Sequence, residues 1–185
     1  MSLTIKEHLS NLLWDGKPRL DTWLTTYCNA TGDTSVGREF LVSAVGRAFD
    51  PGRKVPFILS ILGAQGIGKS RMLQILGDNW YDEQLGPRGS LFRLQQLRRG
   101  WIIELSADPI DISYFIDLNV DEIRLPRLKR QFVMVITTNE PLMGLMRASS
   151  RIRPVVCRKI DLDGLMRDRD HLLAEAVQAY IREAT

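Results

Sequence analysis

A strand pattern that leads directly into a glycine-rich loop and then a helix constrains this chain more than any other feature. Residues 57–62 are almost all apolar, and residues 63–70 follow the pattern Gly-x-x-x-x-Gly-Lys-Ser. Apolar residues at helical spacing after the loop predict a helix with one buried face: Met72, Leu73, Ile75 and Leu76. This order predicts a loop whose backbone N–H groups surround a phosphate group at the positive end of a helix dipole.

The residue types within this loop suit a nucleotide. Gly63, Gly66 and Gly68 are expected to adopt backbone angles that other residues avoid, so that successive N–H groups point into one concavity. Lys69 is expected to lie near the β- and γ-phosphates, and Ser70 to offer its hydroxyl group to Mg²⁺. The alternative is a glycine-rich turn with an incidental lysine. The expected ligands are ATP and Mg²⁺, with ATP bound by Gly63, Ala64, Gln65, Gly66, Ile67, Gly68, Lys69, Ser70 and Arg71.

The composition is that of an ordinary globular protein of one domain, with room for a small helical annex. Hydrophobic residues make up 44% of the 185 residues, and the net charge of +3 is too small to indicate nucleic-acid binding by itself. Cys28 and Cys157 follow no metal-binding spacing and predict neither a disulfide nor a zinc site. No apolar run is long enough to span a membrane and no signal peptide is evident, so we expect a cytoplasmic protein without a membrane partner.

The chain before the loop has helical patterns. Residues 5–13 predict a short helix, Leu20, Trp23 and Leu24 restart helical spacing, and residues 40–49 predict a longer helix. We therefore predict a helical annex over residues 1–52 and an α/β core over residues 53–185, closed by an amphipathic helix near the C-terminal end of the chain. Trp14 and Trp23 either pack between the first two helices or stack on bases.

Two further apolar strands end in polar residues. Residues 100–105 are apolar apart from Glu104, whose carboxylate is expected to bind Mg²⁺ and orient a water molecule beside the loop. Residues 132–138 predict a buried parallel strand followed by Asn139. An amide at that position can donate to a phosphate oxygen and accept from an attacking water. The alternatives are a solvent-exposed acid at a strand end and an asparagine turn.

Several motifs in this order resemble the virulence-associated E family, which comprises phage and plasmid P-loop proteins akin to superfamily-three helicases. They are Trp-Asp-Gly-Lys-Pro-Arg-Leu at residues 14–20, the helix end at residues 49–52, the loop at residues 63–70 and Thr-Thr-Asn at residues 137–139. The resemblance implies a P-loop NTPase core with a parallel sheet, of the AAA+ or superfamily-three helicase type. It also implies a homo-oligomeric ring, such as a hexamer, that acts on single- or double-stranded DNA during phage or plasmid replication in a bacterial host.

The family's acidic residues are only partly matched. Glu104 matches the first of two glutamates, whereas the second falls on Ala107, with Asp108 next to it. Asp121 and Arg124 correspond to an Asp-x-x-Arg segment of the family. The substitution at position 107 leaves open whether Asp108 takes over from a shifted position or hydrolysis is weakened.

The arginines after the last of these strands have a possible role between subunits. Arg151 aligns with the second arginine of the family's Arg-Arg motif, which implies a finger that reaches a phosphate bound by a neighbouring subunit. Arg147 and Arg153 are the alternatives, as are ordinary surface arginines. A separate basic cluster is either a solvated helix face or a phosphate-facing surface: Arg88, Arg93, Arg98 and Arg99.

Three functions remain open on these observations. The first is an ATP-hydrolysing, helicase-like motor with Lys69, Glu104, Asn139 and Arg151 as catalytic residues, and Ser70 and Glu104 as metal ligands. The second is a nucleotide-dependent module that binds DNA or protein with weak or no ATPase activity. The third, a small-molecule kinase, fits poorly because helices precede the first core strand.

Overall fold

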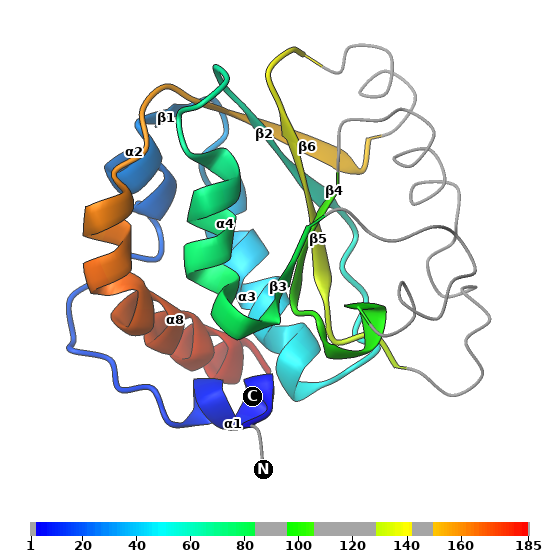
Figure 1. The fold of residues 1–185 in the computed structure, drawn as a ribbon. Coiled ribbons are helices and arrows are strands. Elements are labelled where there is room, and N and C mark those ends of the chain that lie inside the picture. Colours follow the sequence, from blue (N-terminus) through cyan, green and yellow to red (C-terminus); the bar gives the residue numbers. More distant parts are fainter. Residues whose placement is uncertain (1–2, 84–95, 106–128, 142–149, 185) are drawn as a thin grey trace.

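A six-stranded sheet forms the centre of the computed structural model, which describes residues 3–83, 96–105, 129–141 and 150–184 (Figure 1). The strand order is β1-β6-β2-β5-β4-β3. Five strands run parallel, and β1 alone pairs in the antiparallel direction, with β6. The predicted α/β class is therefore correct. The strands are β1 (Ala30–Thr31), β2 (Ile58–Leu62), β3 (Tyr81–Asp82), β4 (Ile102–Leu105), β5 (Val133–Thr138) and β6 (Ile152–Cys157).

The middle of the sheet is apolar because both of its faces are covered. Strand β2 lies between β5 and β6, with Leu59 opposite Val135 and Ile61 opposite Val155. All four of these side chains are fully buried. Continuous apolar runs are typical of parallel strands covered on both faces. Since β2, β4 and β5 are parallel, their carboxyl ends meet at one edge of the sheet.

In the described part of the chain, three helices form a layer beside the sheet: two of them contact its strands, and the third packs against those two. Helix α4 (Lys69–Gly77) and helix α8 (Leu162–Ala184) lie to one side of it in Figure 1 and contact each other. Helix α3 (Val36–Phe49) packs along α8, and its Ala44 carbonyl accepts a hydrogen bond of 2.7 Å from the indole of Trp101. Helix α8 buries an apolar stripe that includes Leu172, Leu173 and Ala176, as its amphipathic pattern predicts.

The first 52 residues share one hydrophobic core with the rest of the chain. They form α1 (Ile5–Ser10), α2 (Trp23–Cys28), strand β1 and α3, and buried side chains of these helices belong to the same cluster as those of the sheet. The helical annex predicted here also contains strand β1, which joins the sheet through Ala30 and Thr31, where a polar loop was expected. The boundary between residues 52 and 53 stays a prediction.

Several local expectations change in the structure. Helix α1 ends at Ser10, capped by Asn11, instead of reaching Leu13, which is 82% exposed. Trp23 is 1% exposed and lies against α3, which leaves no face for stacking on a base. Strand β6 and the edge strand β3, with the 3₁₀ turn η1 (Asp78–Trp80) before it, were not expected.

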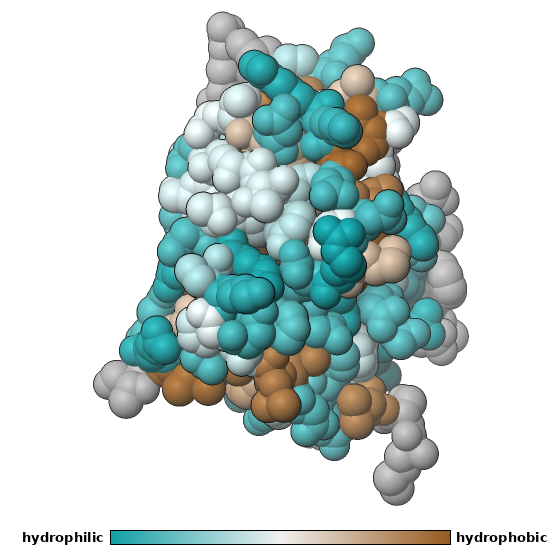
Figure 2. All heavy atoms as spheres, turned by 90° about the vertical axis from the view of Figure 1, so that its left-hand side faces the viewer, coloured by the Kyte–Doolittle hydropathy of each residue, from teal (hydrophilic) through white to brown (hydrophobic). Residues whose placement is uncertain are grey.

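The two cysteines are buried free thiols, as small apolar side chains would be. The face on the left of Figure 1 is mostly hydrophilic, with separate apolar areas (Figure 2). Large apolar side chains are exposed one by one, as is normal for a globular surface: Leu3, Leu13, Val156, Met166 and Ile181. In the described ranges, no helix combines the length and the apolar character that a membrane crossing needs.

Candidate functional site

The glycine-rich loop (residues 63–68) joins the end of β2 to the start of α4, as predicted. Gly68 is the N-cap of α4 and has φ +98°, a left-handed conformation that favours glycine. Gly63 is constrained differently, because a Cβ atom there would lie 2.5 Å from the carbonyl oxygen of Cys157. The φ angle of Gly63 is not positive, so the prediction of an unusual backbone angle is wrong for this residue. Close packing against β6 explains the glycine instead.

Lys69, the first residue of α4, turns its side chain back over this loop. Its Nζ donates to the carbonyl oxygens of Gly63 at 2.7 Å and Ala64 at 2.9 Å, and to Oδ1 of Asn139 at 2.9 Å. The side chain is only 8% exposed, and burial lowers the pKa of this lysine. All three acceptors are neutral oxygens, so the ammonium charge has no carboxylate in direct contact here.

Glu104 lies one residue before the end of β4 and is 7% exposed. Its Oε1 accepts hydrogen bonds from the hydroxyl groups of Ser70, at 2.8 Å, and Thr137. Its Oε2 accepts a hydrogen bond from the phenol of Tyr81. The alternative of a solvent-exposed strand-end acid is therefore wrong, since this carboxylate is buried beside Ser70.

Asn139 follows β5 directly and connects this strand to the glycine-rich loop. The register pairs Thr138 with Leu62, and the carbonyl oxygen of Thr138 accepts a hydrogen bond of 3.1 Å from the N–H of Gly63. The side-chain oxygen of Asn139 is thus held on Lys69 by two adjoining parallel strands.

A cleft of ≈ 520 Å³ opens between these groups. Eight of its lining residues were predicted from the sequence: Gln65, Gly66, Gly68, Lys69, Ser70, Arg71, Glu104 and Asn139. Glu83, Thr137 and Thr138 also line it and were not among the predicted site residues, although both threonines belong to the Thr-Thr-Asn motif. Gly63 and Ala64 instead present carbonyl oxygens to Lys69. Ile67 packs toward Gly63 and the core.

The two unpredicted side chains that donate to Glu104 come from the strands on either side of β4. Thr137 lies two residues before Asn139 on β5, and Tyr81 lies on the edge strand β3 beside β4. Burial and the contact with Glu104 raise the pKa of Tyr81, which keeps its phenol a proton donor. The position of Thr137 follows from strand alternation once the register is known. No sequence signal points to Tyr81, because its strand has only two residues.

The two candidate arginines that the structure describes, Arg151 and Arg153, are not among the residues that line this cleft. The carbonyl oxygen of Arg151 accepts a hydrogen bond of 2.8 Å from the N–H group of Ile58. Arg151 therefore lies beside the start of β2, whereas the cleft lies at the ends of the strands. Arg153 on β6 pairs with Asp33 at 2.5 Å and with Glu39, contacts that raise the pKa of its guanidinium.

Other residues singled out in the sequence lie outside the described ranges: Arg88, Arg93, Ala107, Asp108, Asp121, Arg124 and Arg147. Of the basic cluster, Arg98 and Arg99 are exposed, and Arg99 lies 3.9 Å from Asp82.

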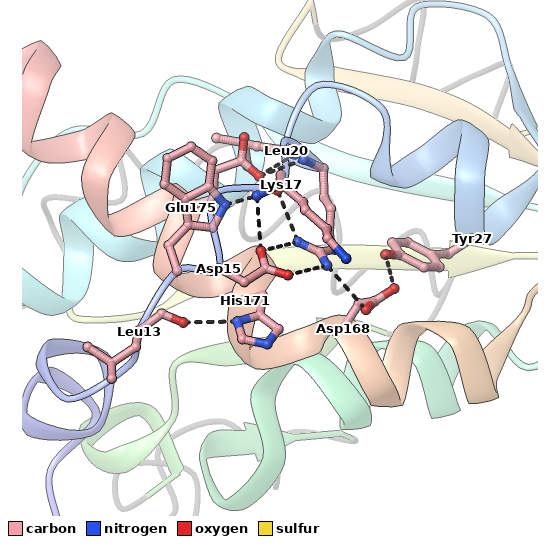
Figure 3. Close-up of polar contacts among 10 residues, drawn as sticks. Leu13, Asp15, Lys17, Leu20, Tyr27, Asp168, His171 and Glu175 are labelled. Atoms are coloured by element: carbon pink, nitrogen blue, oxygen red, sulfur yellow. Dashed lines mark hydrogen bonds and ion pairs between the residues drawn. The ribbon is translucent and has the colours of Figure 1, made fainter.

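The Trp-Asp-Gly-Lys-Pro-Arg-Leu motif, here named the clasp (residues 14–20), docks on α8 (Figure 3). None of its residues lines the cleft. Arg19 forms an ion pair with Asp15 at 2.7 Å and approaches Asp168 at 3.5 Å. Glu175 accepts hydrogen bonds from the backbone N–H groups of Arg19, at 2.6 Å, and Leu20, at 3.0 Å. These contacts indicate that the motif fastens the N-terminal segment to α8.

Two further hydrogen bonds hold the clasp and the residue before it in place. Trp14 donates its indole N–H to the Lys17 carbonyl oxygen at 3.0 Å, within the clasp itself. Nδ1 of His171 lies 2.9 Å from the Leu13 carbonyl oxygen. His171 on α8 thus contacts the segment just before the clasp, and it is not among the residues that line the cleft.

The fold and the cleft together define a mixed α/β protein with a polar site at the carboxyl edge of a mostly parallel sheet. The family model of the virulence-associated protein E-like domain matches residues 9–185. The chain belongs to this family, as its motifs predict.

Among solved structures, the chain is similar to the A form apo structure of the C-terminal region of NrS-1, with a TM-score of 0.61 and 12% sequence identity. The match covers 96% of this chain and 49% of that chain, so this chain spans about half of its length. At this identity the likeness concerns the fold. A comparison with curated proteins finds no match.

Proposed function

We propose that this chain is an ATP-hydrolysing P-loop ATPase, a helicase-like motor domain that acts on DNA in phage or plasmid replication. The observation that carries the proposal is the convergence of Lys69, Ser70, Glu104 and Asn139 around one cleft at the carboxyl edge of the sheet. Ligand sites of open α/β sheets lie at this edge. Membership of the virulence-associated E family supports the biological setting.

The residues of the cleft fit a nucleotide phosphate. The ammonium group of Lys69 is buried and contacts only neutral oxygens among its hydrogen-bond partners, so an anion would compensate its charge. The N-terminus of α4, at Gly68 and Lys69, adds free N–H groups and the positive end of its dipole. Phosphate would take over the hydrogen bonds that Lys69 makes to the loop.

The oxygen ligands also fit Mg²⁺. The Ser70 hydroxyl and the Glu104 carboxylate, 2.8 Å apart, are hard ligands of the kind that Mg²⁺ prefers together with substrate phosphates. When bound, Mg²⁺ would neutralise negative charge on the nucleotide. Within the described ranges, His, Cys, Asp and Glu side chains form no group of three that could hold a metal ion.

Each side chain has a distinct role in the proposed hydrolysis. A water molecule would attack the γ-phosphorus, and the bond between this phosphorus and the oxygen of ADP would break. Glu104 would orient this water and accept the proton that it loses, which leaves ADP and inorganic phosphate. Asn139 turns from Lys69 to the γ-phosphate and the water, which lets Lys69 contact the phosphates. Asn139 and Lys69 would each exchange a hydrogen bond to the other for one to the phosphate. Because the amide is neutral, Asn139 would add no charge to the cleft.

An arginine from a neighbouring subunit would complete the site. Arg151 lies beyond the far end of β2, whose five residues span roughly 17 Å. It is therefore poorly placed for the cleft of its own chain and suited to the cleft of a neighbour in a ring. Arg153, the alternative, is held within its own chain by Asp33 and Glu39.

Phosphate release tests the motor. We expect hydrolysis of ATP that needs Mg²⁺, rises more than linearly with protein concentration as subunits assemble, and increases with single-stranded DNA. Lys69→Ala is expected to remove it, whereas Lys159→Ala, a change of an exposed lysine on the same chain, is expected to leave it intact. Hydrolysis that is indifferent to both concentration and DNA would contradict the motor.

A second candidate function follows from position 107. The alanine there, where the family has a second acid, favours a nucleotide-dependent module that binds DNA or protein with little turnover. It predicts ATP binding that Lys69→Ala abolishes, together with phosphate release near background even with DNA. Calorimetric binding measured beside phosphate release distinguishes the two functions.

A further inference from the structure

The carboxylate of Glu104 is held from two sides by hydroxyl groups. Ser70 and Thr137 donate to Oε1, and Tyr81 donates to Oε2. The donors to Oε1 belong to α4 and β5, whereas Tyr81 belongs to β3 on the other side of β4. With both oxygens engaged, the carboxylate has one orientation relative to Ser70.

We infer that Tyr81 is a positioning residue, which fixes the Glu104 carboxylate so that Oε1 faces Ser70, the residue that would hold Mg²⁺ together with Glu104. The inference rests on the proposed function of the cleft. A carboxylate anchored at one oxygen needs no reorientation when a cation arrives at the other. Partners of this kind around a metal ligand change metal affinity or activity by about 10–100-fold.

Strand register explains how Tyr81 reaches Glu104. Tyr81 on β3 pairs with Ile102 on β4, and Glu104 lies two residues further along β4 on the same face. A diagonal neighbour at this offset is within reach of an aromatic side chain.

Close packing fixes the origin of the Tyr81 side chain. A Cβ atom added to Gly77 would lie 2.8 Å from Cβ of Tyr81 and 3.4 Å from Cβ of Ile102. The end of α4 therefore packs directly against both residues. This packing fixes where the Tyr81 side chain leaves the backbone, and from there its hydroxyl group reaches Glu104.

Glu83 is the competing acceptor for the same hydroxyl group. Its Oε2 lies 3.2 Å from the Tyr81 oxygen, and its side chain lines the same cleft. A phenol has one hydrogen and donates to one carboxylate at a time. The shorter contact is to Glu104, which is buried, while Glu83 is exposed to water. The hydrogen therefore belongs to Glu104.

Tyr81→Phe removes the hydroxyl group and keeps the ring, and Tyr27→Phe is the matched control. Tyr27 also donates to a carboxylate, that of Asp168 at 2.8 Å, but beside the clasp. The titration uses a fluorescent ATP analogue with Mg²⁺ and again with EDTA. In EDTA, we expect the affinity of Tyr81→Phe for the analogue to lie within about twofold of the wild-type value. The factor by which Mg²⁺ increases this affinity should be about tenfold smaller in Tyr81→Phe than in the wild-type protein. In phosphate release, kcat should fall about 10–100-fold with KM within threefold.

Tyr27→Phe should match the wild-type protein in every one of these measurements. A Tyr81→Phe protein that keeps both the Mg²⁺ enhancement and kcat would overturn the inference. A Glu83→Gln protein that loses as much as Tyr81→Phe would also overturn it, because the phenol would then act through Glu83. So would a wild-type protein whose affinity for the analogue is the same in Mg²⁺ and in EDTA.

The two experimental arms separate this inference from the proposed function. A wild-type protein that binds the analogue more tightly with Mg²⁺ but releases no phosphate contradicts the ATPase. In that case the change in Mg²⁺ enhancement on Tyr81→Phe still decides the role of the phenol.

Discussion

The side-chain oxygen of Asn139 accepts a hydrogen bond of 2.9 Å from Nζ of Lys69, which joins the end of β5 to the first residue of α4. An ammonium group only donates, so this contact fixes which end of the amide faces Lys69. The NH₂ group of Asn139 therefore points away from the lysine. Both side chains line the cleft, and the proposed function requires this pair to separate when phosphate binds.

The charge of the residue at position 139 should decide how easily the pair separates. Asn139→Asp would place a carboxylate on Lys69 and compete with phosphate, so we expect ATP affinity to fall by about tenfold or more, about 1.4 kcal/mol. Asn139→Ala should retain affinity within about threefold and lower kcat, because it removes a contact to the water and the γ-phosphate. Equal affinities for the two variants, measured by titration with a fluorescent ATP analogue, would contradict this role of the pair.

The contacts of the clasp predict a large effect on stability. Glu175→Ala leaves the N–H groups of Arg19 and Leu20 without their acceptor, so we expect the free energy of unfolding to fall by about 1.5–3 kcal/mol. Glu183→Ala removes an exposed carboxylate paired with Arg38 at 3.1 Å and should cost about 0.5 kcal/mol or less. Urea denaturation measures both, and comparable losses would show that Glu175 does not fasten the clasp.

Acid pH should weaken the contact between α1 and the helices beside it. Burial first, and then the charge of Arg169, lower the pKa of His8 below its ordinary 6.5, while Asp170 and Asp78 oppose this shift. The unfolded chain therefore binds the proton more tightly, and the contribution of His8 to stability is present above pH 6.5 and is lost as pH falls through the folded pKa.

The matching measurement is the free energy of unfolding at pH 7.5 and at pH 5.5. The wild-type protein should lose more stability between these values than His8→Gln, which carries no titrating group at this position. Parallel losses in the two proteins would show that His8 is not the group responsible.

The arginine prediction can be tested by mixing subunits. Arg151→Ala should retain ATP binding and lose phosphate release, and adding Lys69→Ala subunits should restore part of the activity, because intact clefts then adjoin intact arginines. Arg153→Ala is the comparison: it breaks the pairs with Asp33 and Glu39 and should lower stability more than turnover. If the mixtures release no more phosphate than the two variants release separately, this would argue against a site shared between subunits.

The sequence predicted the parallel part of the fold well, because each strand shows its burial locally. The apolar runs before Gly63, around Ile103 and before Asn139 became β2, β4 and β5. Since parallel strands end at a common edge, the placement of Glu104 and Asn139 beside the glycine-rich loop followed from the chain order. The helix predicted after the loop is α4, and Met72, Leu73, Ile75 and Leu76 are buried in it as predicted.

The missed elements depend on partners far away in the sequence. Strand β6 contains Arg153 and Pro154, two residue types that locally indicate a surface segment and not a buried strand. Its charge is compensated by Asp33 and Glu39, which lie more than a hundred residues earlier. Tyr81 was missed for a similar reason, since its contact with Glu104 exists only through the register of β3 on β4.

Calorimetric titration of ATP with Mg²⁺ into the wild-type protein and into Lys69→Ala tests the central claim most directly. The buried ammonium of Lys69 is the only cleft-lining group, among the described residues, that makes three hydrogen bonds through one charged atom. We predict one ATP site per chain in the wild-type protein and at least about a hundredfold weaker binding in Lys69→Ala, with Lys159→Ala unchanged. Equal binding of ATP by the wild-type and Lys69→Ala proteins, or binding by neither, would contradict the assignment of this cleft as a nucleotide site.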